Sequence, residues 1–424
     1  MAELIIENAS QLVRLAGPAR PRVGSEMLEL GIINAGALLA RDGVIAAVGA
    51  ADEVVPQAGP DAIRIDAGGA VVMPGFVDAH THPVFAGTRE DEYEMRAAGF
   101  TYQQIASQGG GIRSTVRKTR AVSEDGLFEM ALPRVRLLLE HGTTTVEAKS
   151  GYGLTVADEL KILRVIQRLD AETSLELIPT FLGAHEIPDE YRGAREGYIR
   201  LVIDEMLPRV ASERLADYCD VFCESHVFTV DESRRVLSRA KELGLGVRLH
   251  AEQLSLSGGA GLAAELGAAT ADHLEWIDAE GISALRQNGV TAVLLPGAVF
   301  NLGLMRYAPA RAMIEAGVAV VLASDFNPGS SPTPSMQMIL SIACSQMRMT
   351  PAEAITAATI NAAYSLGRGE RIGSLEVGKQ ADAVVFDCSD YRQIPYLFGI
   401  NHALVVIKSG RVVVDRRDKD SCTR

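Results

Sequence analysis

Two histidines, His80 and His82, follow an apolar run in the segment "MPGFVDAHTHPVFAG" (residues 73–87). Residues two apart on a strand point the same way, so both imidazoles can approach one metal ion from the same side. His250 and Asp325 stand at the ends of later apolar runs and can close such a site from the other side. The spacing therefore predicts a metal centre with four protein ligands.

Three imidazoles and one carboxylate suit Zn²⁺ with an open position for water, and iron accepts the same ligands. We expect one Zn²⁺ or Fe³⁺ per chain. Such an ion lowers the pKa of its bound water to about 7 and supplies hydroxide at neutral pH, which predicts a hydrolase. A second ion would need a bridging ligand such as a carboxylated lysine on the fourth strand. That strand contains Glu224 and no lysine, which leaves Lys149 as a possible substitute and favours a single ion.

Histidines gather at the C-terminal ends of the predicted strands. Six of the eight do so, namely His80, His82, His185, His226, His250 and His273. In a barrel of parallel strands these ends converge on the face where the fold places its chemistry. His141 precedes a strand, so we expect it on the opposite face, where it caps a helix. His402 belongs to the C-terminal part of the chain.

The elements that must position these residues alternate along the middle of the chain. Eight apolar runs alternate with amphipathic stretches, a pattern typical of parallel βα units. The runs are "VMPGFVDAH", "TTTVEAKS", "LELIPTFLGAH", "YCDVFCESH", "GVRLHAE", "ATADHLE", "TAVLLPG" and "AVVLASD". Eight strands close a (β/α)8 TIM-type barrel of the α/β class, although eight could also form an open doubly wound sheet. We expect the barrel over residues 71–367, and a small composite β-sandwich domain from residues 1–70 and 368–424.

Composition limits the remaining possibilities. A hydrophobic fraction of 47% and a charged fraction of 22% are typical of a globular protein. The net charge of -13 argues against a nucleic-acid partner, because phosphate binding needs a basic face. The most apolar long run is too short and too broken to span a membrane. Five cysteines, odd in number and without a C-x-x-C pair, indicate reduced thiols and a cytoplasmic location.

Further polar side chains surround the predicted metal centre. Arg89 follows the first barrel strand and can clamp a carboxylate through two parallel hydrogen bonds. The glycine and serine run at residues 329–331 could present N–H groups to an anion, or could form only a turn. His273 is the best-placed general acid or base because imidazole titrates near neutral pH. Asp325 can share in the proton transfer.

The whole pattern resembles the amidohydrolase superfamily. The resemblance runs nearly end to end, through "PGFVDAHTHPVFAGTRE", "GGGIRSTVRKTR", "TTVEAKSGYGL", "TFLGAHEIP", "LHAEQLSLSGG", "ADHLE", "VLLPGAVFNLG", "SDFNPGSSPT" and "EVGKQADAVVFD". H-x-H after P-G-F-x-D marks the superfamily, whereas "VEAKSGYG", "FLGAHE" and "DFNPGSSPT" narrow it to the ring-opening hydrolases of histidine degradation. The resemblance implies hydrolysis of 4-imidazolone-5-propanoate, a small anionic substrate, to N-formimidoyl-L-glutamate. Metal-activated hydroxide would attack the ring carbonyl.

The resemblance also implies roles for individual residues. The implied metal ligands are His80, His82, His250 and Asp325, and the implied substrate contacts are Arg89, Tyr152, His185, Gln253, Asn327, Gly329 and Ser330. Some relatives carry glutamate where this chain has Gln253, and an amide cannot act as a base. The base is then His273 or Glu252. A homodimer is also implied.

Two alternatives stay open. One is another cyclic amidohydrolase or a nucleobase deaminase with the same metal ligands. The other, from a different class, is a catalytically silent scaffold of the same fold. Such a scaffold is expected to have lost metal ligands, and this chain keeps all four.

Overall fold

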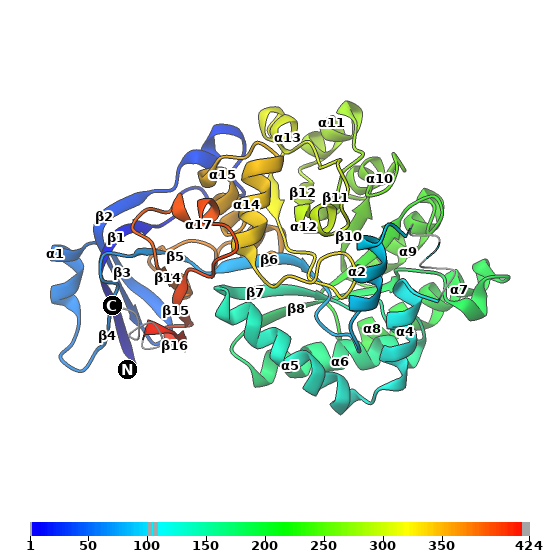
Figure 1. Ribbon diagram of the computed structural model, residues 1–424, viewed down its shortest axis with the longest axis horizontal. Coiled ribbons are helices and arrows are strands. Elements are labelled where there is room, and N and C mark those ends of the chain that lie inside the picture. Colours follow the sequence, from blue (N-terminus) through cyan, green and yellow to red (C-terminus); the bar gives the residue numbers. More distant parts are fainter. Residues whose placement is uncertain (1, 101–103, 105–108, 418–424) are drawn as a thin grey trace.

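The computed structural model describes residues 2–100, 104 and 109–417 of the chain, so Cys422 lies outside the described residues. Two separate β-sheets organise the molecule. Each has eight strands. The one built from both ends of the chain, called the terminal sheet, lies at the left of Figure 1, and the barrel, with its helices, occupies the centre and right. In the part of the chain that is described, no helix is both long enough and apolar enough to cross a membrane.

The barrel consists of eight strands that pair in parallel in chain order. They are β6 (Phe76–Thr81), β7 (Thr143–Lys149), β8 (Glu176–Ala184), β9 (Tyr218–Cys223), β10 (Gly246–Ala251), β11 (Thr270–His273), β12 (Thr291–Leu294) and β13 (Val320–Leu322). The chain after β13 meets β6, where the His82 N–H donates to Phe326 O at 2.8 Å and the Asp325 N–H donates to His80 O at 3.0 Å. These bonds bring the two ends of the sheet together and confirm the predicted barrel.

Helices between the strands and after the last of them surround the barrel (Figure 1). They are α2 (Glu90–Ala97), α4 (Ile112–Ala121), α5 (Glu124–Glu140), α6 (Val156–Glu172), α7 (Arg195–Arg200), α8 (Leu207–Ser212), α9 (Val230–Glu242), α10 (Gly259–Leu266), α11 (Ala279–Asn288), α12 (Pro296–Asn301), α13 (Ala310–Ala316), α14 (Met336–Gln346), α15 (Pro351–Ala357) and α16 (Ile360–Ser365). Side-chain caps start several of them; for example, the Thr155 hydroxyl accepts a hydrogen bond from the Asp158 N–H at the start of α6. His141 is the C-cap residue of α5, as predicted.

The terminal sheet joins both ends of the chain, which confirms the predicted second β unit. Its order is β16 (Arg411–Asp415), β15 (Ala403–Lys408), β14 (Ala383–Phe386), β5 (Val71–Pro74), β1 (Glu3–Val13), β2 (Ile32–Arg41) and β3 (Val44–Ala50), and β4 (Ile63–Asp66) pairs with β1. The short helices α1 (Ala51–Val54) and α17 (Gln393–Tyr396) accompany it. The domain boundaries at residues 70 and 368 stay a prediction.

The first predicted barrel strand, "VMPGFVDAH", divides in two. Its first part is β5, which pairs with β1 and β14 of the terminal sheet, and its second part is β6. Gly75 separates them, and a Cβ at this position would overlap the Thr144 side chain. The close approach of the Thr144 side chain to the backbone therefore favours glycine here.

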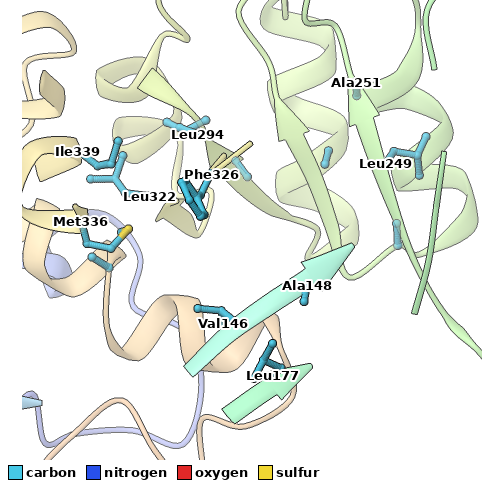
Figure 2. Packing of buried hydrophobic residues seen from close by; sticks show 14 of the residues in the cluster. Val146, Ala148, Leu177, Leu249, Ala251, Leu294, Leu322, Phe326, Met336 and Ile339 are labelled. Carbon is cyan, nitrogen blue, oxygen red and sulfur yellow. The ribbon is translucent and has the colours of Figure 1, made fainter. Parts of the chain in front are cut away.

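The main apolar core lies between the barrel strands and their helices (Figure 2). Val146 and Ala148 of β7 belong to this core. Successive side chains of a strand point to opposite faces, so the alternating residues Glu147 and Lys149 point into the barrel interior. Both are fully buried there. The interior of this part of the barrel is therefore charged.

Candidate metal centre

The predicted ligands converge at one end of the barrel. The candidate ligand atoms of His80, His82 and His250 all lie within 4.8 Å of one another, and the three side chains are buried. Asp325 Oδ1 lies 3.6 Å from Nε2 of His80 and 3.6 Å from Nε2 of His82. Within residues 2–100, 104 and 109–417, these histidines are the one group of three or more histidine, cysteine or acidic side chains arranged to share an ion.

The donor atoms of this cluster fit a metal ion. His80 Nε2 and His82 Nδ1 are buried and have no hydrogen-bond partner in the described part of the chain. Burial lowers the pKa of both imidazoles well below its ordinary value, so both are neutral, the form that binds metal. An unpaired buried nitrogen costs free energy, which a bound cation offsets. Three imidazoles and a carboxylate suit zinc or iron.

Two buried carboxylates contact the histidines from behind. His80 Nδ1 lies 2.6 Å from Asp272 Oδ2, a hydrogen bond that fixes the proton on Nδ1 and leaves Nε2 for a cation. His250 Nδ1 lies 3.0 Å from Asp220 Oδ2, although this contact is not aligned as a hydrogen bond. The backbone N–H of His250 also donates a hydrogen bond to Asp220 Oδ1 at 3.1 Å. Each aspartate therefore contacts the ring of one predicted ligand.

These aspartates were not predicted from the sequence. The available signal was the presence of charged residues within otherwise apolar strands, as in "YCDVFC" for Asp220, "TTTVEAK" for Glu147 and Lys149, and "GVRLHA" for Arg248. A charge inside such a strand is buried only when it is paired.

The backbone is strained at three positions around the cluster. Glu252, His273 and Asp325 have φ values of +54°, +80° and +52°, in the left-handed region that residues other than glycine seldom adopt. Each such residue costs about 1–3 kcal/mol and persists only where the surrounding structure imposes it. Strain of this kind is typical of functional sites.

His273 lies beside the proposed ligands. Its ring centroid is 5.3 Å from that of His250 and 5.7 Å from that of His80. Burial alone lowers the pKa of His273, but the charges of Glu275 and Asp325 outweigh burial and raise it. The Glu275 carboxylate lies 3.5 Å from His273 Nδ1. His273 can therefore carry a proton next to the metal centre.

Two predicted substrate contacts, Tyr152 and His185, lie beside His82. The His185 ring stacks on His82 with centroids 5.3 Å apart, and Tyr152 lies 5.8 Å from His82. Burial lowers the pKa of His185 to about 3 and raises that of Tyr152, so both groups are neutral. His226, in contrast, is exposed in the turn after β9 and does not join the cluster.

Arg89 lies at the N-terminal end of α2. Its Nη2 is 2.5 Å from Glu92 Oε2, and a Cβ at Gly329 would overlap its guanidinium group. The predicted arginine and the predicted glycine contact are therefore neighbours. Gln253 lines a cavity together with Glu275 and Trp276.

The 325–330 loop is organised by Asn327. Asn327 Oδ1 accepts hydrogen bonds of 2.8 Å from the N–H groups of both Gly329 and Ser330, while Nδ2 donates to Asp325 O at 2.6 Å and to Ser330 Oγ at 2.7 Å. The Ser330 hydroxyl donates to Asp325 Oδ2 at 3.1 Å. The two N–H groups are thus already paired, and of the two alternatives the structure favours the turn over anion binding by these groups.

Glu252, a candidate base, and Lys149, a candidate bridging ligand, are both held by contacts within the protein. Glu252 Oε1 accepts a hydrogen bond from the Ala260 N–H in the first turn of α10, and burial raises the pKa of Glu252 to about 7. Lys149 Nζ lies 2.7 Å from Glu147 Oε1 and 2.7 Å from Asp220 Oδ2. An ammonium held by two carboxylates argues against the carboxylated lysine that a second ion would need.

Comparison with known proteins identifies relatives in both sequence and fold. A sequence profile of the amidohydrolase family matches residues 71–413. The chain is 58% identical to an imidazolonepropionase of Solibacter usitatus over 98% of this chain and all of that protein, and 51% identical to one of Symbiobacterium thermophilum over 97% of each. In fold it is similar to an adenosine deaminase from Xanthomonas campestris with bound zinc, at a TM-score of 0.71 and 22% identity, covering 98% of this chain and 94% of that one.

Proposed function

The chain belongs to the imidazolonepropionases of the amidohydrolase family, and we propose from this that it hydrolyses 4-imidazolone-5-propanoate to N-formimidoyl-L-glutamate in histidine degradation. It is a hydrolase of a cyclic amide C–N bond. Water adds to the ring carbonyl, the carbonyl–nitrogen bond breaks, the released nitrogen takes a proton and the carbonyl carbon becomes a carboxylate.

The observation that carries this proposal is the 58% identity that extends over essentially the whole chain. The likeness to a deaminase concerns the fold alone, so the alternative of a nucleobase deaminase has less support. The silent-scaffold alternative is also less supported, because His80, His82, His250 and Asp325 are present and lie together.

We propose that His80, His82, His250 and Asp325 hold one zinc or ferric ion. When bound, such an ion supplies Lewis acidity that makes water a nucleophile near neutral pH and stabilises negative charge on the carbonyl oxygen. The residues hold this position rigidly, because the Asp272 hydrogen bond and the strained backbone at Asp325 fix the side-chain directions.

His273 is proposed as the general acid that protonates the leaving ring nitrogen. Its raised pKa keeps a proton available near neutral pH, and its ring lies within 6 Å of two proposed ligands by the centroid distances of 5.3 and 5.7 Å. Asp325, whose pKa burial raises to about 6, can accept a proton from the attacking water. Glu252 is the weaker candidate, since its carboxylate is bonded to the start of α10.

Arg89 is proposed to bind the propionate group. Its guanidinium charge attracts the substrate carboxylate, which competes with Glu92 for the same donors. Tyr152 and His185 line the pocket as neutral rings, and Gln253, Gly329 and Ser330 complete the proposed substrate contacts. Asn327 acts in this proposal by shaping the loop that carries Asp325.

A homodimer and a cytoplasmic location complete the proposal. The location is supported by four free cysteines in the described residues, Cys219, Cys223, Cys344 and Cys388.

The test is the loss of imidazolone absorbance on addition of the purified chain, with N-formimidoyl-L-glutamate identified as the product. The chain should open the ring, should stop after treatment with a chelator, and should release no ammonia from nucleobases. Ammonia release without ring opening would favour the deaminase instead.

A further inference from the structure

A lysine lies at the centre of the charged barrel interior. Lys149, the last residue of β7, is fully buried. Its ammonium Nζ lies 2.7 Å from Glu147 Oε1, 2.7 Å from Asp220 Oδ2 and 3.8 Å from Asp272 Oδ2. The proposed catalytic roles leave this ammonium group unexplained, although burying a charge is costly unless it is paired.

Two of its partners are the carboxylates that lie behind the proposed metal ligands. Asp220 Oδ2, which Lys149 contacts, is also the atom 3.0 Å from His250 Nδ1. Asp272 Oδ2 is likewise the atom that pairs with His80 Nδ1 at 2.6 Å. A single ammonium group therefore connects two ligand imidazoles that come from different strands, β6 and β10.

The charge count explains why this position needs a cation. The interior cluster contains three carboxylates, Glu147, Asp220 and Asp272, and two cations, Lys149 and Arg248. The guanidinium of Arg248 stays 3.9 Å from the Glu147 and Asp272 carboxylates and donates instead to Ala79 O at 2.8 Å. Lys149 is thus the cation in hydrogen-bond contact with this acidic group.

We propose that Lys149 is a positioning residue of the metal centre, whose ammonium holds Asp220 and Asp272 in place and so fixes the orientation of His250 and His80 toward the ion. This proposal rests on the metal centre of the proposed function and deepens it. In this arrangement the histidines bind the ion, the aspartates contact the histidines, and the lysine contacts the aspartates. Outer partners of metal-binding histidines set ring orientation and metal affinity.

The charge state of Lys149 agrees with this role. Burial lowers the pKa of Lys149, but Asp220 and Glu147 outweigh burial and raise it above its ordinary value. The side chain is therefore an ammonium at neutral pH, with its protons directed to carboxylates.

The test is Lys149→Met in the full chain, which removes the charge and keeps most of the side-chain volume. After metal removal by dialysis, Co²⁺ is titrated into the chain. We expect the Co²⁺ dissociation constant to rise about 10–100-fold. The visible absorption bands of the Co²⁺-saturated variant should also change, since the ligand geometry is no longer fixed.

Lys408→Met is a matched control for loss of a buried cation. Lys408 is only 7% exposed, and its Nζ contacts Asp382 at 2.8 Å and Glu176 at 3.2 Å, without any histidine behind these carboxylates. The Lys408→Met variant should lose thermal stability as Lys149→Met does. Its Co²⁺ dissociation constant should stay within about threefold of the wild-type value, and its Co²⁺ absorption bands should be unchanged. Wild-type Co²⁺ affinity and bands in Lys149→Met, or equal losses of affinity in both variants, would overturn the proposal.

A second variant covers the case in which Lys149→Met does not fold. Adding Glu147→Gln removes one carboxylate as well, so the cluster keeps two carboxylates and one cation and the same net charge of minus one as the original three and two. The double variant should fold and still bind Co²⁺ more weakly, because Asp220 has lost its partner; wild-type affinity would sink the idea. These measurements use no substrate, so a wild-type chain that binds Co²⁺ but leaves the imidazolone ring intact would refute only the proposed function.

Discussion

Replacing Asn327 with alanine removes four hydrogen bonds from the loop that carries Asp325. Two of them bind the N–H groups of Gly329 and Ser330, and the other two bind Asp325 O and the Ser330 hydroxyl. A hydrogen bond contributes about 0.5–1.5 kcal/mol net, so the four sum to about 4 kcal/mol. Because the loop can admit water once the side chain is gone, we expect the free energy of unfolding to fall by about 2–4 kcal/mol.

The same change should lower kcat. Asp325 depends on the loop for its position, and its carboxylate loses the support of a fixed Ser330 hydroxyl. We expect kcat for imidazolone propionate to fall at least about tenfold, since small displacements of catalytic groups are costly. Urea unfolding at saturating metal gives the stability, and the loss of imidazolone absorbance gives the kinetic constants.

Asn361→Ala is the control. Asn361 is also buried, bonds the backbone of Arg22 through both its oxygen and its nitrogen, and donates to Val320 O. It should lose about 2–3 kcal/mol with unchanged kcat and KM. If Asn327→Ala unfolded at the wild-type urea concentration and raised only KM, Asn327 would be a direct substrate contact and the reasoning from the loop would be wrong.

Three further outcomes are expected. Arg89→Met should raise KM for imidazolone propionate about 10–100-fold with a smaller change in kcat, because one charge-assisted contact is lost, whereas Arg20→Met on the surface should leave KM unchanged. A chelator should stop turnover and lower Tm, because metal present at 100 times its Kd stabilises the folded chain by about 2.7 kcal/mol. In His80→Ala, added Zn²⁺ should leave Tm unchanged. Burial raises the pKa of Glu353, but Arg311 outweighs it and holds that pKa below its usual 4.5. This stabilisation is present above about pH 4.5 and lost as pH falls through the lower folded pKa, so urea unfolding of wild type and Glu353→Gln should differ by about 1–2 kcal/mol at pH 7 and converge at lower pH.

The barrel was predictable because local pattern and global fold agree. Each strand is a short apolar run, and each is followed by a stretch with helical periodicity, so the eight strands could be counted in advance. The boundary at Gly75 could not, since the division of "VMPGFVDAH" depends on which sheet each half joins. Pairing partners distant in sequence decide that, and they leave no local signal.

The positions of the histidines were also only partly predictable from local sequence. Six stand at strand ends in the sequence, but His226 turns outward in a surface turn, while His273 lies beside His250. Strand ends converge by topology, yet the direction of a side chain at or just after the end of a strand depends on local φ and ψ. At His273 the backbone is left-handed, which the sequence does not reveal.

The sequence by itself determined the barrel, the gathering of histidines at its strand ends and the family, because each depends on residue types at fixed spacing along the strands. Only the tertiary structure decided that Asn327 binds its own loop and that Lys149 lies between the carboxylates behind His80 and His250. The physical reason is that a buried charge is tolerated only beside its partners. Those partners come from β7, β9 and β11, which closure of the barrel brings together.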